Sequence, residues 1–192
     1  MKYYIIAGEA SGDLHGSNLI KGIRQVDPSA QIRCWGGDLM KEAGAELVKH
    51  YKEGAIMGFV EVVANLGKLA RNLNNCKEDV LNYNPDVLIL IDYPGFNFRI
   101  AEFAKKNGIR TFYYIAPKVW AWKEGRITKL RKYVDKLFII FPFEIDYFHK
   151  ILKLNRQSCR LIAPLWSVSC LGGGVVLSAG LPALCSICSS TA

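Results

Sequence analysis

A loop near the start of the chain combines two carboxylate side chains with small residues and directly follows an expected strand. It runs from Gly8 to Gly16 and reads Gly-Glu-Ala-Ser-Gly-Asp-Leu-His-Gly. The small residues let a ligand approach the backbone, and the start of the following helix favours an anion. Glu9 and Asp13 oppose a simple phosphate cradle because they add negative charge. The pattern is not Gly-x-Gly-x-x-Gly, and a turn that only packs a helix on a strand would also explain it.

A second segment with candidate chemistry is 92–97, Asp-Tyr-Pro-Gly-Phe-Asn, which directly follows the apolar run 87–91. A carboxylate at the mouth of a buried strand can act as a general base or accept a hydrogen bond from a sugar hydroxyl. The alternative is that Asp92 caps a helix that begins near Asn97. Position along the chain leaves both interpretations open.

A third segment, 116–123, carries two tryptophans in an expected loop. Trp120 and Trp122 are costly there unless they are buried or bind a ligand, and their faces beside Lys118 suit a sugar or acyl group next to a phosphate. The alternative is one core tryptophan and one that lines a helix contact. The basic run 118–136 that begins in this loop is usually only a solvated face.

Segment 56–73 has apolar residues at helical spacing. A helix that faces the core is the common explanation for such a pattern. The sharper hypothesis is a helix that lies in a membrane surface or receives acyl chains. The residues that would make this contact are Phe59, Val62, Val63, Leu66 and Leu69.

Metal and triad chemistry are not supported by the pattern of ligand-type residues. His15, His50 and His149 have no metal-ligand spacing to one another or to a cysteine, and no Ser-His-Asp order is evident. The Cys-x-x-Cys pair at 185–188 has no second pair or histidine nearby. A dinucleotide-dependent oxidoreductase is disfavoured because glycines, and no acid, follow the expected strand that ends at Trp35.

The elements that must position these residues alternate between strand and helix with short connections. This alternation predicts an α/β fold with a doubly wound, Rossmann-like parallel sheet. Ligands of such sheets bind at the carboxyl ends of the strands, where the three segments above lie. The expected strands are 3–7, 31–35, 46–48, 87–91, 110–115 and 137–141, and the expected helices are 14–26, 39–43, 57–83, 100–106, 124–133 and 143–150.

Charge divides the 192 residues into two unequal parts near residue 150. The chain carries a net charge of +8, yet residues 161–192 contain no charged side chain, and no acidic residue follows Asp146. The composition excludes a disordered tail, a collagen-like fibre and a small disulfide-stapled module. We therefore expect one Rossmann-like domain over 1–150 and a tail of irregular structure over 151–192, the product of truncation or a frameshift. We expect no signal peptide at the N-terminus, and two scattered cysteines in the first part favour a reducing cytoplasm.

Five segments of the first part form an ordered set of motifs. They are 7–13 (Ala-Gly-Glu-Ala-Ser-Gly-Asp), 57–62 (Met-Gly-Phe-Val-Glu-Val), 92–97 (Asp-Tyr-Pro-Gly-Phe-Asn), 117–122 (Pro-Lys-Val-Trp-Ala-Trp) and 141–144 (Phe-Pro-Phe-Glu). Taken together and in order, they resemble lipid-A-disaccharide synthase over residues 1 to about 150. One turn departs from the family pattern: it is Gly36-Gly37-Asp38 here, where the family has Gly-Gly-Pro.

The resemblance implies a GT-B glycosyltransferase with two Rossmann-like domains and an active site between them. Such an enzyme joins UDP-2,3-diacylglucosamine to 2,3-diacylglucosamine 1-phosphate and releases UDP and a β-1,6-linked disaccharide 1-phosphate. It works without a metal or cofactor as a peripheral protein on the cytoplasmic face of the inner membrane of Gram-negative bacteria. An anionic membrane surface and the two sugar substrates are the implied partners, and nucleic acid is not.

The resemblance also implies residue roles. Asp92 matches the family's essential aspartate and would be the base that deprotonates the acceptor hydroxyl, with Glu9 and Asp13 as further catalytic candidates. The helix of segment 56–73 would contact acyl chains or the membrane. The implied substrate-binding residues are Gly8, Ser11, Gly12, Asn97, Lys118, Trp120 and Trp122.

Residues 151–192 match nothing in the family's donor-binding domain, so the chain is expected to bind donor weakly and to turn over little alone. Three alternatives remain at this point. The first is another nucleotide-sugar enzyme of the same fold, such as an epimerase. The second is the oxidoreductase already disfavoured, and the third is a non-catalytic module that binds a membrane surface.

Overall fold

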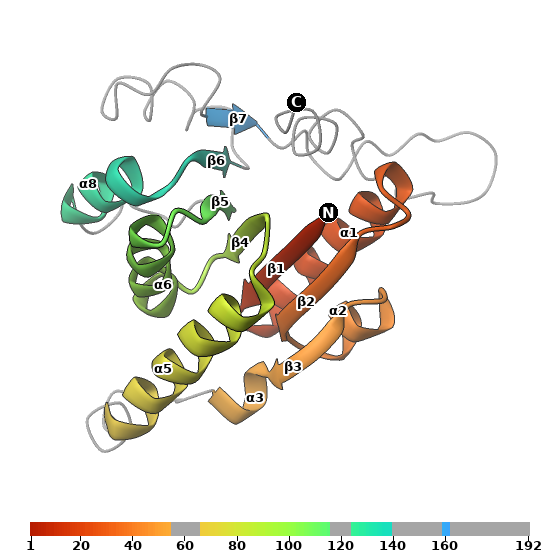
Figure 1. The fold of residues 1–192 in the computed structure, drawn as a ribbon, viewed down its shortest axis with the longest axis horizontal. Helices are drawn as coiled ribbons and strands as arrows, with labels where there is room; N and C mark the ends of the chain where they lie inside the picture. Colours follow the sequence, from red (N-terminus) through yellow and green to blue (C-terminus); the bar gives the residue numbers. More distant parts are fainter. Residues whose placement is uncertain (55–65, 116–123, 140–158, 162–192) are drawn as a thin grey trace.

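In the part of the chain that the structure describes, seven parallel strands form one sheet in the order β3-β2-β1-β4-β5-β6-β7 (Figure 1). The computed structural model describes residues 1–54, 66–115, 124–139 and 159–161. The order reverses between the neighbours β1 and β4, which confirms the expected Rossmann-like α/β class. The strands are β1 Lys2–Ala7, β2 Gln31–Gly36, β3 Glu46–His50, β4 Val87–Ile91, β5 Arg110–Tyr114, β6 Lys136–Ile139 and β7 Cys159–Leu161.

Helices cover both faces of the sheet. In the described part of the chain they are α1 Ala10–Val26, α2 Asp38–Glu42, α3 Tyr51–Gly54, α5 Leu66–Tyr83, α6 Pro94–Lys106 and α8 Glu124–Tyr133. Buried residues of α1 and α2 pack with one face of the sheet, and those of α5, α6 and α8 pack with the other (Figure 1). Two apolar clusters therefore hold the sheet between two helical layers.

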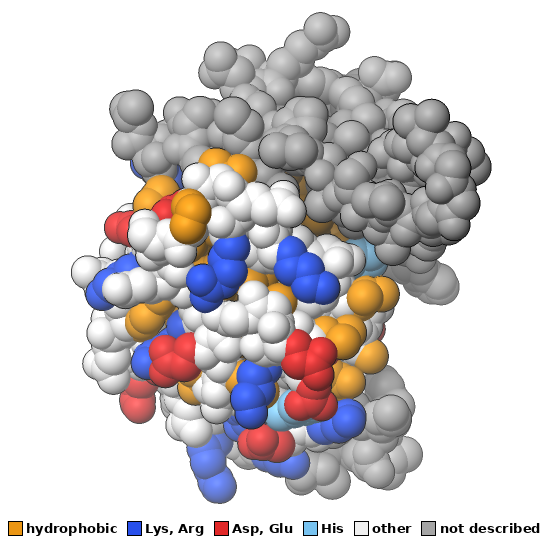
Figure 2. Space-filling view, turned by 90° about the vertical axis from the view of Figure 1, so that its right-hand side faces the viewer, with side chains coloured by type: hydrophobic (Ala, Val, Ile, Leu, Met, Phe, Trp, Pro, Cys, Tyr) orange, Lys and Arg blue, Asp and Glu red, His pale blue; other side chains and the backbone are white. Residues whose placement is uncertain are grey.

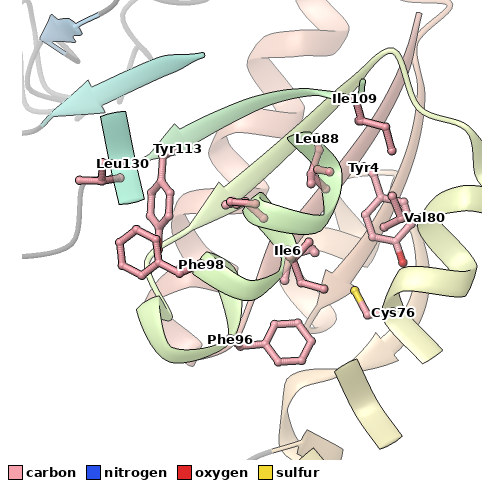
Figure 3. Packing of buried hydrophobic residues seen from close by; sticks show 14 of the residues in the cluster. Tyr4, Ile6, Cys76, Val80, Leu88, Phe96, Phe98, Ile109, Tyr113 and Leu130 are labelled. Carbon is pink, nitrogen blue, oxygen red and sulfur yellow. The ribbon is translucent and has the colours of Figure 1, made fainter. Parts of the chain in front are cut away.

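Strand β4 shows why an unbroken apolar run lies at the centre. All five of its residues are buried. Leu88 and Leu90 belong to the cluster under α5 and α6, whereas Val87, Ile89 and Ile91 belong to the cluster on the other face. Because successive strand residues point to opposite faces, only a strand covered on both sides needs such a run. Figure 3 shows the first cluster, with residues of β1, β4 and β5 packed against α5, α6 and α8.

Two helices begin earlier than the periodicity predicts. Helix α1 starts at Ala10, with Glu9 at its N-cap, so Ser11 and Asp13 lie inside the helix and not before it. Helix α6 starts at Pro94, because proline suits the first turn of a helix, where its missing N–H leaves no hydrogen bond unmade. The sheet also extends past residue 150, since β7 pairs with β6. The expected helix 143–150 and most of the expected tail lie outside the described residues.

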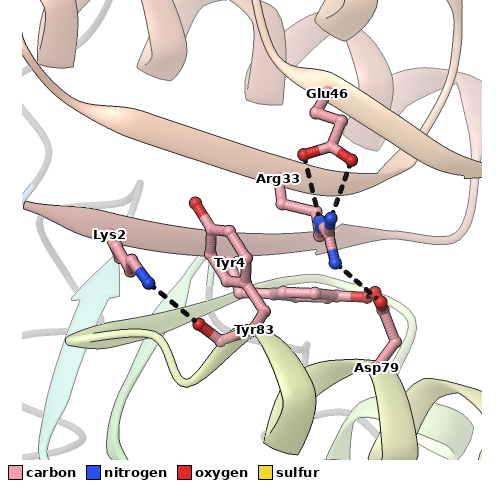
Figure 4. Close-up of polar contacts among 6 residues, drawn as sticks. All are labelled: Lys2, Tyr4, Arg33, Glu46, Asp79 and Tyr83. Carbon is pink, nitrogen blue, oxygen red and sulfur yellow. Dashed lines mark hydrogen bonds and ion pairs between the residues drawn. The ribbon is translucent and has the colours of Figure 1, made fainter.

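A charged network fastens α5 to the edge of the sheet (Figure 4). The Arg33 guanidinium of β2 donates to both carboxylate oxygens of Glu46, at 3.1 and 2.8 Å, and to Asp79 Oδ1 of α5 at 2.9 Å. It also lies over the ring of Tyr83, 4.8 Å from its centroid. The hydrogen bond from Tyr4 to Asp79 completes the contact. The Glu46 hydrogen bond is the main cause that raises the pKa of Arg33, so the guanidinium stays charged.

Replacing Arg33 by methionine is expected to lower the free energy of unfolding by about 1–3 kcal/mol, because it leaves the half-buried Asp79 without its cation. The Glu46 half contributes less, since that carboxylate is 60% exposed. Urea unfolding followed by circular dichroism measures the loss. The matched control is Arg99→Met on the exposed side of α6. An equal loss in both variants would show that the network contributes nothing specific.

Candidate functional site

The loops that follow β1 and β4 meet at the carboxyl edge of the sheet. Ala7 and Ile91 are register partners at the ends of these strands, so Gly8 and Asp92 follow side by side. A Cβ built on Gly8 would lie 2.3 Å from the ring of Tyr93, so only glycine allows this approach. The structure thus brings together two of the three segments that the sequence singles out.

The backbone at Asp92 adopts an uncommon left-handed conformation. Asp92 has φ 42° and Tyr93 has φ 46°, a region that residues with a side chain rarely occupy. The Asp92 carbonyl oxygen accepts hydrogen bonds from Asn97 Nδ2 at 2.8 Å and from Tyr113 Oη at 2.5 Å. These two donors stabilise the turn, and strained turns of this kind concentrate at functional sites.

The capping interpretation of Asp92 does not hold in this structure. Tyr93, and not Asp92, occupies the N-cap of α6, and no side chain makes a capping hydrogen bond there. The half-buried Asp92 carboxylate therefore stands at the end of the central strand, outside the helix.

Asn97 lies beneath the turn and is fully buried. Its Nδ2 atom also donates to the Ile91 carbonyl oxygen at 3.2 Å, so both hydrogen bonds of this amide nitrogen go to the backbone. Among the described residues, its Oδ1 atom has no hydrogen-bond partner. Asn97 therefore helps to hold the backbone at Asp92, and the contact with substrate that the resemblance implies for it stays a prediction.

Asp13 and Glu9 occupy different environments although they share one loop motif. Asp13 is 4% exposed, and its carboxylate accepts the backbone N–H groups of Gly37, Leu39 and Met40 at 2.8, 3.2 and 3.1 Å. Asp13 therefore caps α2 although it lies 24 to 27 residues away in the sequence. Glu9 is exposed at the start of α1, where a carboxylate can meet a ligand.

Ser11 and Gly12, the other predicted site residues of this motif, also differ in their exposure to solvent. Ser11 is exposed, whereas Gly12 is buried and its Cβ position would lie 3.1 Å from the Ala7 side chain. Gly12 thus allows α1 to pack closely on β1. Leu69, predicted as an acyl contact, is half-buried and packs against the core cluster under α5.

Several predicted site residues cannot be placed. Phe59, Val62, Val63, Lys118, Trp120 and Trp122 lie outside the described residues, and Leu66 is described only as the first residue of α5. Among the helices that the structure does describe, none is both long and apolar enough to cross a bilayer. In the same part of the chain, no three His, Cys, Asp or Glu side chains come together as a metal site.

A small pocket, partly open to solvent, lies beside Gly8 between the sheet and α5. Of the residues in its wall, Gly8 and Leu69 were predicted as site residues from the sequence, and the remaining lining residues were not. Trp35 stands near the end of β2 and Lys49 near the end of β3, so the rule that directed attention to strand ends would have found both. The residues that line the pocket include Gly8, Trp35, Lys49, Asn72, Tyr93 and Phe96.

Two cysteines of the described part, Cys34 and Cys76, are unsuited to nucleophilic chemistry. Cys34 and Cys76 are both buried and free. Burial raises the pKa of the Cys34 thiol to about 12 and that of Cys76 as well. Both are therefore neutral thiols at physiological pH and act as apolar core residues.

Comparison with known proteins adds independent findings. A family model described as lipid-A-disaccharide synthetase matches residues 3–156. The lipid-A-disaccharide synthase of Geobacter metallireducens is 45% identical over 146 residues, which are 76% of this chain and 38% of that protein. The protein of the same name from Coxiella burnetii (strain Dugway) is 38% identical over 146 residues, which are 76% of this chain and 39% of its own length. The chain therefore spans less than half the length of these relatives.

Among solved structures, a putative UDP-N-acetylglucosamine 2-epimerase from Listeria monocytogenes superposes with a TM-score of 0.64. The match covers 86% of this chain and 45% of that one, at 10% sequence identity. Similarity at this level shows the shared fold alone.

Proposed function

The chain belongs to the lipid-A-disaccharide synthase family, and from this premise we propose that it supplies the acceptor side of a lipid A glycosyltransferase. The proposed donor is UDP-2,3-diacylglucosamine and the proposed acceptor is 2,3-diacylglucosamine 1-phosphate. The products would be UDP and the β-1,6-linked disaccharide 1-phosphate. The observation that carries this proposal is the Asp92 carboxylate, held at the end of β4 by a turn that Asn97 and Tyr113 stabilise.

The reaction needs one base. An α-linked donor that yields a β-linked product is inverted at the anomeric carbon, so the acceptor oxygen attacks from the face opposite the leaving UDP. Asp92 would take the proton from the acceptor's 6-hydroxyl as that oxygen attacks. Glu9, exposed on the neighbouring loop, is the second carboxylate that can bind a hydroxyl of the acceptor. Asp13 would act through the backbone it caps, since its oxygens accept three backbone N–H groups.

The proposal assigns residues 1–150 to an acceptor-side domain, to which β7 adds a strand. The donor site would come from the part of the family enzyme that lies beyond the matched residues. We therefore expect the 192-residue chain alone to release little UDP.

Segment 56–73 would contact acyl chains or an anionic membrane surface on the cytoplasmic side of the inner membrane. On the face shown in Figure 2, basic and acidic side chains of the described residues are intermixed and do not form a single basic patch. The support for a membrane contact is therefore the apolar spacing of segment 56–73, not the charge of that face.

The test is a chimera in which the matched part of this chain replaces its counterpart in the Geobacter metallireducens relative. We expect this chimera to release UDP from UDP-2,3-diacylglucosamine only when the acceptor is present. Mass spectrometry of the product should show the disaccharide 1-phosphate. The 192-residue chain alone is the matched control and should release far less UDP. Release without acceptor, or a chimera that folds and makes no disaccharide while the relative does, would contradict the proposed function.

A further inference from the structure

A β-bulge places a lysine in the wall of the pocket beside Gly8. Ile6 of β1 is the register partner of Trp35 of β2, and Trp35 is in turn the partner of Lys49 of β3. The register of β2 and β3 shifts between Cys34 and Trp35, so Lys49, instead of Val48, lies opposite Trp35. Bulges near functional sites commonly redirect a side chain in this way. Here the result is a row of three side chains on the sheet face that α5 and α6 cover.

The indole N–H of this row is a buried donor without an acceptor. Trp35 is 9% exposed, and among the described residues its Nε1 atom has no hydrogen-bond partner. Its ring stacks on Phe96 with a centroid separation of 5.8 Å, which fixes its position. Because a buried N–H that makes no hydrogen bond is unfavourable, the wall favours a ligand that brings an acceptor.

Lys49 adds a positive charge next to this donor. Its Nζ atom lies 5.2 Å from the centroid of the Trp35 ring and donates to Asn72 Oδ1 at 2.7 Å. Asn72 is itself 7% exposed, so the ammonium is held by a nearly buried amide of α5. An ammonium with a fixed position and a neutral partner can still donate to a bound anion.

None of the described residues that line the pocket is acidic. His50, which also lines it, accepts the Lys52 backbone N–H at Nδ1, so in its neutral form the ring carries its proton on Nε2, which faces Asp38 Oδ2 at 3.4 Å. The exposed Asp38 is therefore engaged outside the pocket wall. The lining offers donors, positive charge and aromatic faces, which together suit an anionic group attached to a sugar.

We propose that this pocket binds an oxyanion, the phosphate of a phosphorylated sugar, with Lys49 Nζ and Trp35 Nε1 as its donors. The identity of the sugar rests on the proposed function, in which the acceptor carries a 1-phosphate. The binding of a sugar phosphate as such does not depend on transfer activity. The two proposals can therefore fail separately.

The experiment is a titration of the ¹⁵N-labelled 192-residue chain with glucosamine 1-phosphate. The indole N–H resonance of Trp35, assigned by its loss in Trp35→Phe, should shift in a saturable way. Inorganic phosphate should shift the same resonance and compete, whereas glucosamine without phosphate should bind at least about tenfold more weakly. This comparison separates recognition of the phosphate from recognition of the sugar.

Variants of one residue test the donor. Lys49→Met removes the charge but keeps the length of the side chain, and it should weaken binding about tenfold or more. Lys49→Arg should recover most of the affinity because it keeps a charged donor. Lys41→Met, an exposed lysine of α2, is the matched control and should change binding less than about twofold. Circular dichroism of each variant checks that the fold is intact.

Three results would overturn the inference. The first is equal binding by wild type and a folded Lys49→Met variant. The second is a Trp35 resonance that stays in place while others move, which would locate the phosphate elsewhere. The third is an acylated glucosamine that binds equally well with and without its phosphate, which would assign the pocket to an acyl chain. Binding without disaccharide synthesis in the chimera would refute the proposed function and leave this inference standing.

Discussion

Replacing Asp92 by asparagine is expected to slow disaccharide formation by about 10²- to 10⁴-fold, the range that a general base contributes. The amide has nearly the same shape as the carboxylate but cannot take the proton of the attacking hydroxyl. The two hydrogen bonds that stabilise the turn end on the backbone carbonyl of Asp92, which the substitution does not alter. We therefore expect the left-handed turn and the fold to persist.

The measurement is single-turnover disaccharide formation by the chimera described above, with saturating substrates, so that the chemical step is compared. Glu78→Gln, a carboxylate-to-amide change on the exposed side of α5, is the matched control and should keep the wild-type rate. Glu9→Gln should raise the acceptor's KM more than it lowers kcat, because Glu9 is proposed to bind a hydroxyl. A rate for Asp92→Asn within about twofold of wild type would exclude Asp92 as the base.

The sheet could be predicted from local pattern because its central strands are buried on both faces. Strand β4 occupies Val87–Ile91 as expected, since five apolar residues between polar ends have no other stable place in such a fold. The loops after β1 and β4 could be predicted as site loops because the strands before them are parallel. Once the strands are parallel, their carboxyl ends must lie at one edge.

The contacts that fix the site could not be predicted because they join residues distant in sequence. Tyr113 Oη reaches the Asp92 carbonyl from β5, 21 residues further along the chain. Lys49 lies in the pocket wall because the register of β2 and β3 shifts between Cys34 and Trp35, and the hydrophobic pattern of the sequence does not indicate this shift. Local periodicity indicates which face of a helix or strand a residue lies on, but it does not indicate which distant residue packs against that face.

Asp13 is the instructive case. It stands in a small-residue motif that looks like a ligand loop, and sequence reasoning gave it a catalytic role. The structure buries it and directs its oxygens at the first turn of α2, between 24 and 27 residues away. A Cβ on Gly37 would lie 2.4 Å from Asp13 Oδ2, so the glycine is needed for this contact. Carboxylates that bind backbone N–H groups and those that bind ligands look alike in sequence.

Asp13→Ala is accordingly expected to lower the free energy of unfolding by about 3–5 kcal/mol, because it leaves three backbone N–H groups without their acceptor. The carboxylate also faces the positive end of α2, so its charge is lost where it stabilises most. Asp38→Ala, in the same turn but exposed, is the matched control and should cost about 0.5 kcal/mol or less. Urea unfolding measures both.

Amide hydrogen exchange distinguishes this positioning role from a direct catalytic one. If Asp13 positions the turn, exchange in Asp13→Ala should accelerate most at Gly37, Leu39 and Met40, while the amides of β4 keep their protection. Because Met40 is fully buried in the cluster that α1 covers, loosening this turn should also disturb the packing of α1 on the sheet. A stable Asp13→Ala variant with unchanged exchange and no transfer activity would instead make Asp13 a residue that contacts substrate. The carboxylate would then have to leave its three backbone partners when the acceptor binds.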